Sequence, residues 1–169
     1  NKAAISRNAR HNRANSLIQK ALSTAEFAAI WEPKGLFATD KKRPDGMTTF
    51  PYKGGKSLAW DFTVVDTVCA TYCQTSAEEP CKTAEQAELR KIHKYRHLTD
   101  FHFIPIGAET LGPFGPHAVQ FLEDLGNKIS QINGERRSKS FLFQSIGIAI
   151  QQGNASCVMG TTGSMGKLE

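Results

Sequence analysis

Four stretches of the chain carry apolar residues at helical intervals or are otherwise typical of helices. In residues 9–27 the apolar positions recur every three or four residues, which is typical of an amphipathic helix; they are Ala14, Leu17, Ile18, Ala21 and Leu22. Residues 82–98 predict a strongly charged helix. Two more helices are predicted over residues 117–132, starting just after a proline, and over residues 139–159.

Short apolar runs between these helices predict four strands, over residues 27–33, 45–52, 57–68 and 101–110. The second and third flank "KGGK", residues 53–56, whose paired glycines favour a hairpin turn. Along the third strand, alternation assigns two faces. One face carries Leu58, Trp60, Phe62 and Val64, and the other carries Ala59, Asp61, Thr63 and Val65.

The predicted order is helix, strand, strand, strand, helix, strand, helix, helix, which indicates an α/β domain around a small mixed sheet flanked by helices. At 169 residues the chain has the length of one domain, expected to span residues 10–160 with flanking segments at 1–9 and 161–169. It starts without a methionine, and Leu168 and Glu169 resemble a cloning scar, so we interpret it as a piece of a larger polypeptide.

Composition adds a mild electrostatic signal. The formal net charge of +5 and the isoelectric point near 9.1 favour an anionic partner, and nucleic acid is the commonest such partner. No apolar run approaches the roughly 20 residues needed to cross a membrane.

Three of the four cysteines cluster as Cys69, Cys73 and Cys81. They could belong to a zinc site, for which His93 and Cys157 are the loose candidates for a fourth ligand. Alternatively, they are free thiols of an intracellular protein.

Two aspartates are the main candidates for chemistry. Asp45 opens the second predicted strand, and Asp61 lies inside the apolar run of the third. A carboxylate in a core strand is costly to bury without a partner. Either each aspartate is structural, as a hairpin residue and a salt-bridged core residue, or the two share a hard divalent cation such as Mg²⁺. In the second case Thr63 lies where a hydroxyl or a main-chain carbonyl would reach the metal.

The order "PD", hairpin, "D-x-T" resembles the PD-(D/E)XK nuclease pattern, from which Thr63 departs because that pattern has lysine there. A variant of this superfamily carries the lysine on the following helix. The resemblance therefore implies that Lys91 or Lys94 serves the site, with Lys91 preferred and Tyr95 on the same face as Lys91. Glu32 is either an auxiliary metal ligand or an exposed strand end. His11 and Asn12 occupy the first helix, where related nucleases often place a glutamate.

A longer ordered pattern covers most of the chain, from about Arg10 to Gly160: "RHN", "EP", "GL", "RPDG", "WD", "AE", "KY" and "ET". It resembles the restriction-like endonuclease domain that follows the reverse transcriptase in eukaryotic non-LTR retrotransposons. The resemblance implies a nuclear, Mg²⁺- or Mn²⁺-dependent enzyme that nicks or cuts target DNA for insertion. It also implies that a reverse transcriptase is joined to this domain in the full polyprotein.

Basic residues predict contacts with phosphate more than with bases. They are Lys41, Lys42 and Arg43 before Asp45, Lys53 and Lys56 beside the hairpin turn, and Arg136 and Arg137 in a later loop. The alternative function is a DNA-binding module that has kept the nuclease fold and lost cleavage, which Thr63 at the lysine position favours.

Overall fold

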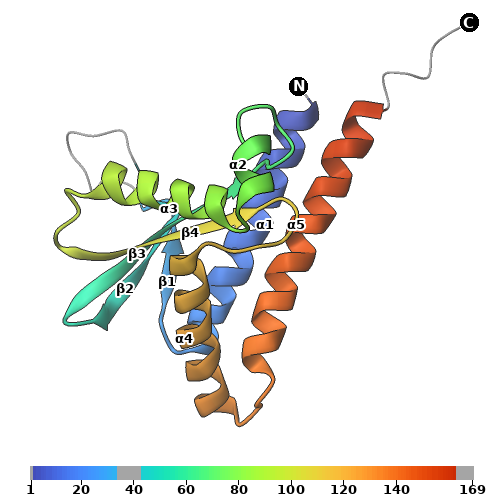
Figure 1. Ribbon diagram of the computed structural model, residues 1–169. Helices are drawn as coiled ribbons and strands as arrows, with labels where there is room; N and C mark the ends of the chain where they lie inside the picture. The colour runs from blue at the N-terminus through green and yellow to red at the C-terminus, as the bar shows by residue number, and fades with distance from the viewer. Residues whose placement is uncertain (1, 34–42, 163–169) are drawn as a thin grey trace, which may run out of the picture.

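A computed structural model describes residues 2–33 and 43–162 of the chain. The elements in chain order are α1 (Lys2–Thr24), β1 (Ala29–Trp31), β2 (Gly46–Lys53), β3 (Lys56–Val65), α2 (Cys73–Glu78), α3 (Lys82–Tyr95), β4 (Phe101–Glu109), α4 (Pro116–Asn133) and α5 (Ser138–Thr162). The strands form one mixed sheet in the order β1-β2-β3-β4, and helices flank it (Figure 1). The predicted α/β class is confirmed.

Strand β3 connects the two halves of the sheet. It pairs with β2 in an antiparallel hairpin, whose turn residues Gly54 and Gly55 have positive φ angles of 58° and 75°. Such angles suit glycine and match the turns that join tightly paired strands. With β4, β3 pairs in parallel, so the connection between them must cross over the sheet, and it carries α2 and α3.

The predicted alternation of side chains along β3 is confirmed. Leu58, Trp60 and Phe62 belong to the main hydrophobic core, and Val64 packs against it. The same core includes side chains of α1, α4 and α5, and α1 and α5 run side by side in opposite directions (Figure 1). The other face of β3 carries Asp61 and is packed by α3.

Two buried glutamates connect α3 to its neighbours, and we call Glu88 and Glu109 the capping carboxylates. Glu109, at the end of β4, accepts hydrogen bonds from the main-chain N–H groups of Thr83 and Ala84 and from the Thr83 hydroxyl. These donors lie in the first turn of α3, where N–H groups have no partner within the helix. Glu109 therefore fixes the start of α3 to the end of β4.

Glu88 fixes the start of α4 in the same way. Its carboxylate accepts the main-chain N–H groups of His117 and Ala118, in the first turn of α4, and that of Gly107 in β4. The side chain is fully buried, and a Cβ at Gly107 or at Gly115 would collide with it. Both glycines therefore make room for a carboxylate that joins three elements.

Several details of the elements differ from the sequence prediction. The segment of the clustered cysteines, for which no helix was predicted, contains the short helix α2, which has no buried residue. Helix α1 begins at Lys2, seven residues before the predicted start at residue 9. Helix α4 includes Pro116 at its first turn, because the fixed φ of proline and its missing N–H suit that position.

Among residues 2–33 and 43–162, no helix is both long and apolar enough to cross a lipid bilayer.

Candidate functional site

Asp45 lies immediately before β2, beside the middle of β3. Its main-chain N–H donates to the carbonyl of Trp60, and its Oδ2 accepts the main-chain N–H of Phe62 at 2.7 Å. These two residues stand on either side of Asp61, so Asp45 is bound to the stretch of β3 that carries the second aspartate. Because the N–H groups of a strand point within the sheet plane, the carboxylate of Asp45 lies at the edge of β3.

Helix α1 contributes two side chains to Asp45. His11 Nε2 lies 3.2 Å from Asp45 Oδ2, and Asn15 Nδ2 donates to the same oxygen at 3.2 Å. Asn15 also accepts a hydrogen bond from the indole N–H of Trp60 at 2.9 Å, so a buried tryptophan holds its amide in place. No site residue was predicted on this helix, yet α1 supplies both of these contacts.

The contacts at Asp45 set the pKa values of both partners. The hydrogen bond to Asp45 raises the pKa of His11 against the opposing effect of burial. Burial acts to raise the pKa of Asp45, but His11, the Phe62 N–H and Asn15 together hold it below its ordinary value. Asp45 therefore carries a negative charge at neutral pH, and its neighbours favour that charge.

A glycine lets β2 approach this arrangement closely. A Cβ at Gly46 would overlap the indole ring of Trp60, which faces it across the antiparallel pair. With glycine there, the ring fills the space and its N–H reaches Asn15. The position of Asp45 thus depends on the residue that follows it.

Asp61 is contacted by α3. Its carboxylate is almost fully buried, and Lys91 Nζ lies 2.6 Å from its Oδ1. The hydroxyl oxygen of Tyr95 lies 2.7 Å from its Oδ2 and 2.6 Å from the carbonyl oxygen of Arg43. Lys91 and Tyr95 are one turn apart on α3, which is why both reach the same carboxylate.

Lys94 approaches the same carboxylate from farther away. Its Nζ lies 3.9 Å from Asp61 Oδ2, 2.9 Å from the Tyr95 hydroxyl and 4.5 Å from the centre of the Tyr95 ring. Both predicted lysines therefore come near Asp61, and Lys91 makes the closer contact. Tyr95, which is nearly fully buried, carries its hydroxyl between Asp61 and Lys94.

Thr63 and Glu32 are the other two predicted metal ligands. Thr63 lies two residues beyond Asp61 on the same face and is half-buried beside Lys91. Glu32 is exposed, with a positive φ of 38°, and its main-chain N–H donates to the carbonyl of Asp45. Glu32 thus touches Asp45 through its main chain.

The predicted DNA contacts are spread over the molecule. Lys41 and Lys42 lie outside the described residues, while Arg43 is exposed just before Asp45. Lys53 and Lys56 pair across the hairpin end, where Lys56 Nζ donates to the carbonyl of Thr99. Arg136 and Arg137 are exposed in the turn between α4 and α5, and Arg137 pairs with Glu135.

The described residues contain no cluster of side chains that is ready to hold a metal ion. In the described part of the chain, no group of three or more His, Cys, Asp or Glu side chains is arranged to hold a metal ion. The two carboxylates are instead paired with side chains of the protein, Asp45 with His11 and Asn15 and Asp61 with Lys91 and Tyr95.

The cysteines do not form such a centre. Cys69, Cys73, Cys81 and Cys157 are free thiols. Burial, with the nearby carboxylate of Glu109, raises the pKa of the Cys81 thiol, and this disfavours the thiolate form that binds zinc.

Several basic residues near the site escaped the sequence analysis. Arg7 and Arg10 of α1 and Arg90 of α3 line the same cavity as Lys91. The spacing of Arg7 and Arg10 on one side of a helix was a usable signal, as was the four-residue spacing of His11 and Asn15. Arg90 had no signal of its own, because it stands in a segment where charged residues are frequent.

The chain was compared with known proteins. It matches no model of a protein family and no curated protein. What the site can do is therefore inferred from its own residues.

Proposed function

We propose that this domain is a metal-dependent DNA endonuclease of the restriction-like, PD-(D/E)XK kind, acting in a retroelement polyprotein beside a reverse transcriptase. The observation that carries the proposal is the 2.6 Å contact between Lys91 on α3 and Asp61 on β3, next to Asp45. It supplies an ammonium group from the following helix where Thr63 replaces the lysine of the usual pattern.

Each residue of the site has a separate role in the proposed cleavage of a phosphodiester bond. Asp45 and Asp61 would hold Mg²⁺ or Mn²⁺, with Thr63 beside them and Glu32 as an outer contributor. The bound metal supplies polarisation of the phosphate and a water of lowered pKa. Lys91 brings a positive charge to the phosphate oxygens, where negative charge grows in the transition state. Tyr95 keeps the carboxylate of Asp61 oriented, and Lys94 adds a second positive charge nearby.

DNA as the substrate is supported by charge. The net charge of +5 attracts an anionic polymer, and exposed Arg43 lies next to Asp45. Lys53 and Lys56 at the hairpin end would contact phosphates farther along a duplex. These contacts position a duplex without selecting a sequence, so the choice of target would come from other parts of the polyprotein.

The test is nicking of supercoiled plasmid by the purified chain in Mg²⁺ or Mn²⁺, with EDTA as the negative condition. We expect the parent to nick in metal and Asp61→Ala to lose cleavage by about 1,000-fold or more. DNA binding, measured separately in EDTA, should stay within about twofold of the parent, because removing a negative charge near phosphate does not weaken binding.

Asp100→Ala provides the matched control, since Asp100 is an exposed aspartate between α3 and β4. It should cleave as the parent does. Equal cleavage by Asp61→Ala and the parent would refute the proposed site, and nicking that persists in EDTA would refute the metal requirement.

A second candidate function is a DNA-binding module without cleavage. It is favoured by the internal pairing of both carboxylates, Asp45 with His11 and Asn15, and Asp61 with Lys91. Such pairing satisfies the two charges without any metal. This alternative predicts salt-sensitive DNA binding and no nicking in either metal, and the plasmid assay separates the two functions.

A further inference from the structure

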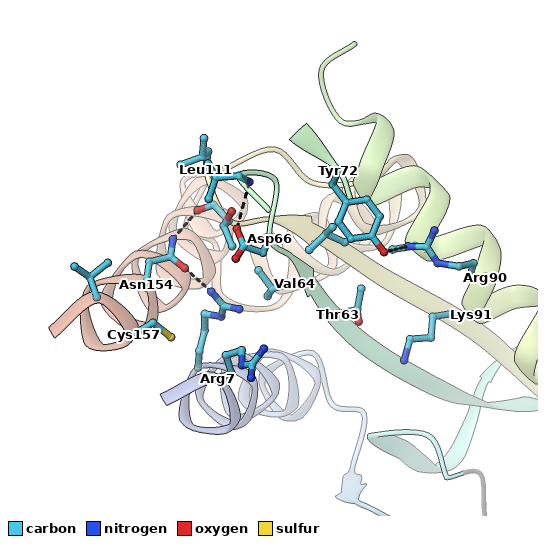
Figure 2. A pocket seen from close by; sticks show the side chains of 16 residues that line it. Arg7, Thr63, Val64, Asp66, Tyr72, Arg90, Lys91, Leu111, Asn154 and Cys157 are labelled. Atoms are coloured by element: carbon cyan, nitrogen blue, oxygen red, sulfur yellow. Dashed lines mark hydrogen bonds between the residues drawn. The ribbon is translucent and has the colours of Figure 1, made fainter. Parts of the chain in front are cut away.

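A cavity of about 760 Å³ opens beside Lys91, at the end of β3 that leads away from the hairpin. Its walls come from α1, α3 and α5 and from the segment that follows β3, as Figure 2 shows. Small-molecule sites have volumes of about 300–1,000 Å³, so this cavity is large enough for a nucleotide. The Asp45–Asp61 site described above does not account for this volume.

The charge of the cavity wall is unbalanced. Four cationic side chains line it, namely Arg7, Arg10, Arg90 and Lys91, against the single lining carboxylate of Asp66. Arg10 is nearly buried, and its guanidinium donates to the side-chain oxygen of Asn154 on α5, which fixes the cation in the wall. Arg7 faces the cavity from α1, opposite Lys91 on α3 (Figure 2). Lys91 is paired with Asp61, so the excess positive charge of the wall comes from the three arginines, and it favours a negatively charged ligand.

The remaining wall suits a flat, apolar group. Val64 and Val65 from β3 line it, and Val68 and Leu111 stand at its rim with about two thirds of their surface exposed. Tyr72 adds an aromatic ring, and the Arg90 guanidinium lies 5.7 Å from the centre of that ring. Aromatic and guanidinium planes are the groups on which proteins stack bases that have left a helix.

The cavity is continuous with the candidate site. Thr63 and Lys91, the neighbours of Asp61, line it directly. A smaller cavity of about 290 Å³ shares Arg7, Arg10 and Thr63 with it and extends to His11, which contacts Asp45. A phosphate at Lys91 would thus leave the attached nucleoside at the mouth of the larger cavity.

We infer that this cavity receives one unstacked nucleotide of the DNA strand bound at Asp45 and Asp61. The phosphate lies against Arg7 and Lys91, and the base lies on the valines and Tyr72. This inference rests on the proposed function in taking DNA as the ligand. It makes the domain a binder of locally opened DNA, in which one base next to the held phosphate leaves the helix at the cost of unstacking.

Binding of small probes in EDTA tests the cavity without any cleavage. Deoxyadenosine 5′-monophosphate, deoxyadenosine and inorganic phosphate are titrated separately into the parent chain, and dissociation constants are taken from nuclear magnetic resonance shifts. We expect the nucleotide to bind about tenfold more tightly than either fragment, because base and phosphate are held together. Tyr72→Ala should remove that advantage, and Arg7→Ala should weaken the nucleotide and phosphate alike.

Matched controls are Phe50→Ala, an exposed aromatic residue of β2, and Arg96→Ala, an exposed arginine just beyond α3. Both should bind the nucleotide as the parent does. If phosphate binds as tightly as the nucleotide and Tyr72→Ala changes nothing, the cavity holds an anion only and the inference is overturned.

A second measurement separates a nucleotide within DNA from a free one. The fluorescent base 2-aminopurine is placed at successive positions of a duplex, and its emission is recorded with the parent and with Tyr72→Ala in EDTA. We expect emission to rise at one position with the parent and to rise less with the variant. Binding of the free nucleotide without any such rise would assign the cavity to free nucleotides and overturn the inference.

The outcomes also separate this inference from the proposed function. A chain that nicks plasmid but neither binds the nucleotide nor unstacks a base keeps the endonuclease and loses the cavity assignment. A chain that unstacks a base but never nicks in metal keeps the cavity assignment and loses the endonuclease.

Discussion

The molecule contains two sets of poorly exposed carboxylates that differ in their main kind of partner. The capping carboxylates, Glu88 and Glu109, accept hydrogen bonds chiefly from main-chain N–H groups at the starts of α4 and α3. Asp45 and Asp61, which we call the site carboxylates, are contacted mainly by side chains of α1 and α3, although Asp45 also accepts the main-chain N–H of Phe62.

The two sets of carboxylates differ in whether a partner can move away from the carboxylate while the domain stays folded. A main-chain donor in a helix start cannot move away unless the helix moves, so a capping carboxylate is fixed for as long as the domain is folded. Lysine and histidine side chains can rotate without any movement of their helix, as the exchange for a metal ion in the proposed function requires. The two sets are alike in being poorly exposed, so the main kind of partner is what sets them apart, and the variants below test whether that difference matters.

The largest expected effect is on folding, at Glu88. Glu88→Ala leaves the N–H groups of Gly107, His117 and Ala118 without their acceptor in a buried place, which should lower the free energy of unfolding by about 3 kcal/mol. Urea unfolding followed by circular dichroism measures it. Glu85→Ala, on the same helix but paired only with Lys82, should change stability by less than about 0.5 kcal/mol. Equal losses would show that main-chain capping has no special value.

Lys91→Ala should have the next largest effect, on cleavage. Loss of the ammonium at Asp61 should slow plasmid nicking by about 100-fold, which corresponds to about 2.7 kcal/mol in the activation barrier. Lys94→Ala is the matched control, because its ammonium is farther from Asp61; it should mainly weaken DNA binding and reduce the salt dependence of that binding.

The reverse pattern would assign the catalytic charge to Lys94. If neither variant slows nicking, the lysine on the following helix has no role in cleavage. In the double variant, Thr63→Lys added to Lys91→Ala, recovery of activity would show that the two positions serve one site.

A smaller effect is expected at the hydroxyl of Thr83, one of three donors to the capping carboxylate Glu109. Thr83→Val removes the hydroxyl that lies 2.6 Å from Glu109 while keeping the shape of the side chain, and it should cost about 1 kcal/mol of stability. Thr24→Val, at the exposed end of α1, removes a hydroxyl bonded to the carbonyl of Lys20 and should cost less than about 0.5 kcal/mol. A difference of zero between them would mean that the Glu109 contact adds nothing.

The smallest effect is the pH dependence of the His11–Asp45 pair. The pKa of His11 is raised in the folded chain, so its stabilisation is complete below its unfolded pKa and is lost as the pH rises through the folded pKa. The pKa of Asp45 is lowered, so its stabilisation is present above its unfolded pKa and is lost as the pH falls through the folded pKa. The pair therefore stabilises the fold most between the two unfolded pKa values, at mildly acidic pH.

Nuclear magnetic resonance titration of His11 in EDTA checks this directly. We expect its pKa to lie above 6.5, the ordinary value for histidine, in the parent and to fall towards it in Asp45→Asn. An unchanged His11 pKa in that variant would show that Asp45 does not cause the shift.

The sequence predicted the strands and Asp61 well because both depend on local alternation. A charge within an apolar run was visible without any structure, and the twofold period of β3 correctly assigned it to the face opposite the core. The hairpin followed from Gly54 and Gly55, whose backbone angles bear out the turn. The helix that carries Lys91 and Tyr95 was also predicted from its own residues.

Contacts between residues that are far apart in the chain could not be predicted from the sequence. Glu88 stands in a charged helix beside Glu85 and Arg90, and its main-chain donors lie 19, 29 and 30 residues farther along the chain. A buried glutamate and an exposed one look alike in such a segment. The same holds for Arg10, whose partner Asn154 belongs to the last helix. Helix α2 was missed because it buries no residue and so leaves no apolar period.

Helix α3 carries both kinds of carboxylate contact within two turns, and this makes the protein sensitive to changes of length. Glu88 meets α4, and Lys91 and Tyr95 meet Asp61, at spacings of three and four residues. One residue inserted between Glu88 and Lys91 would rotate everything beyond it by about 100° and carry both side chains away from β3. The exposed end of α2 near Glu78 can gain or lose residues with far less consequence. Insertions and deletions among natural variants of this domain should therefore fall before α3 and spare the helix itself.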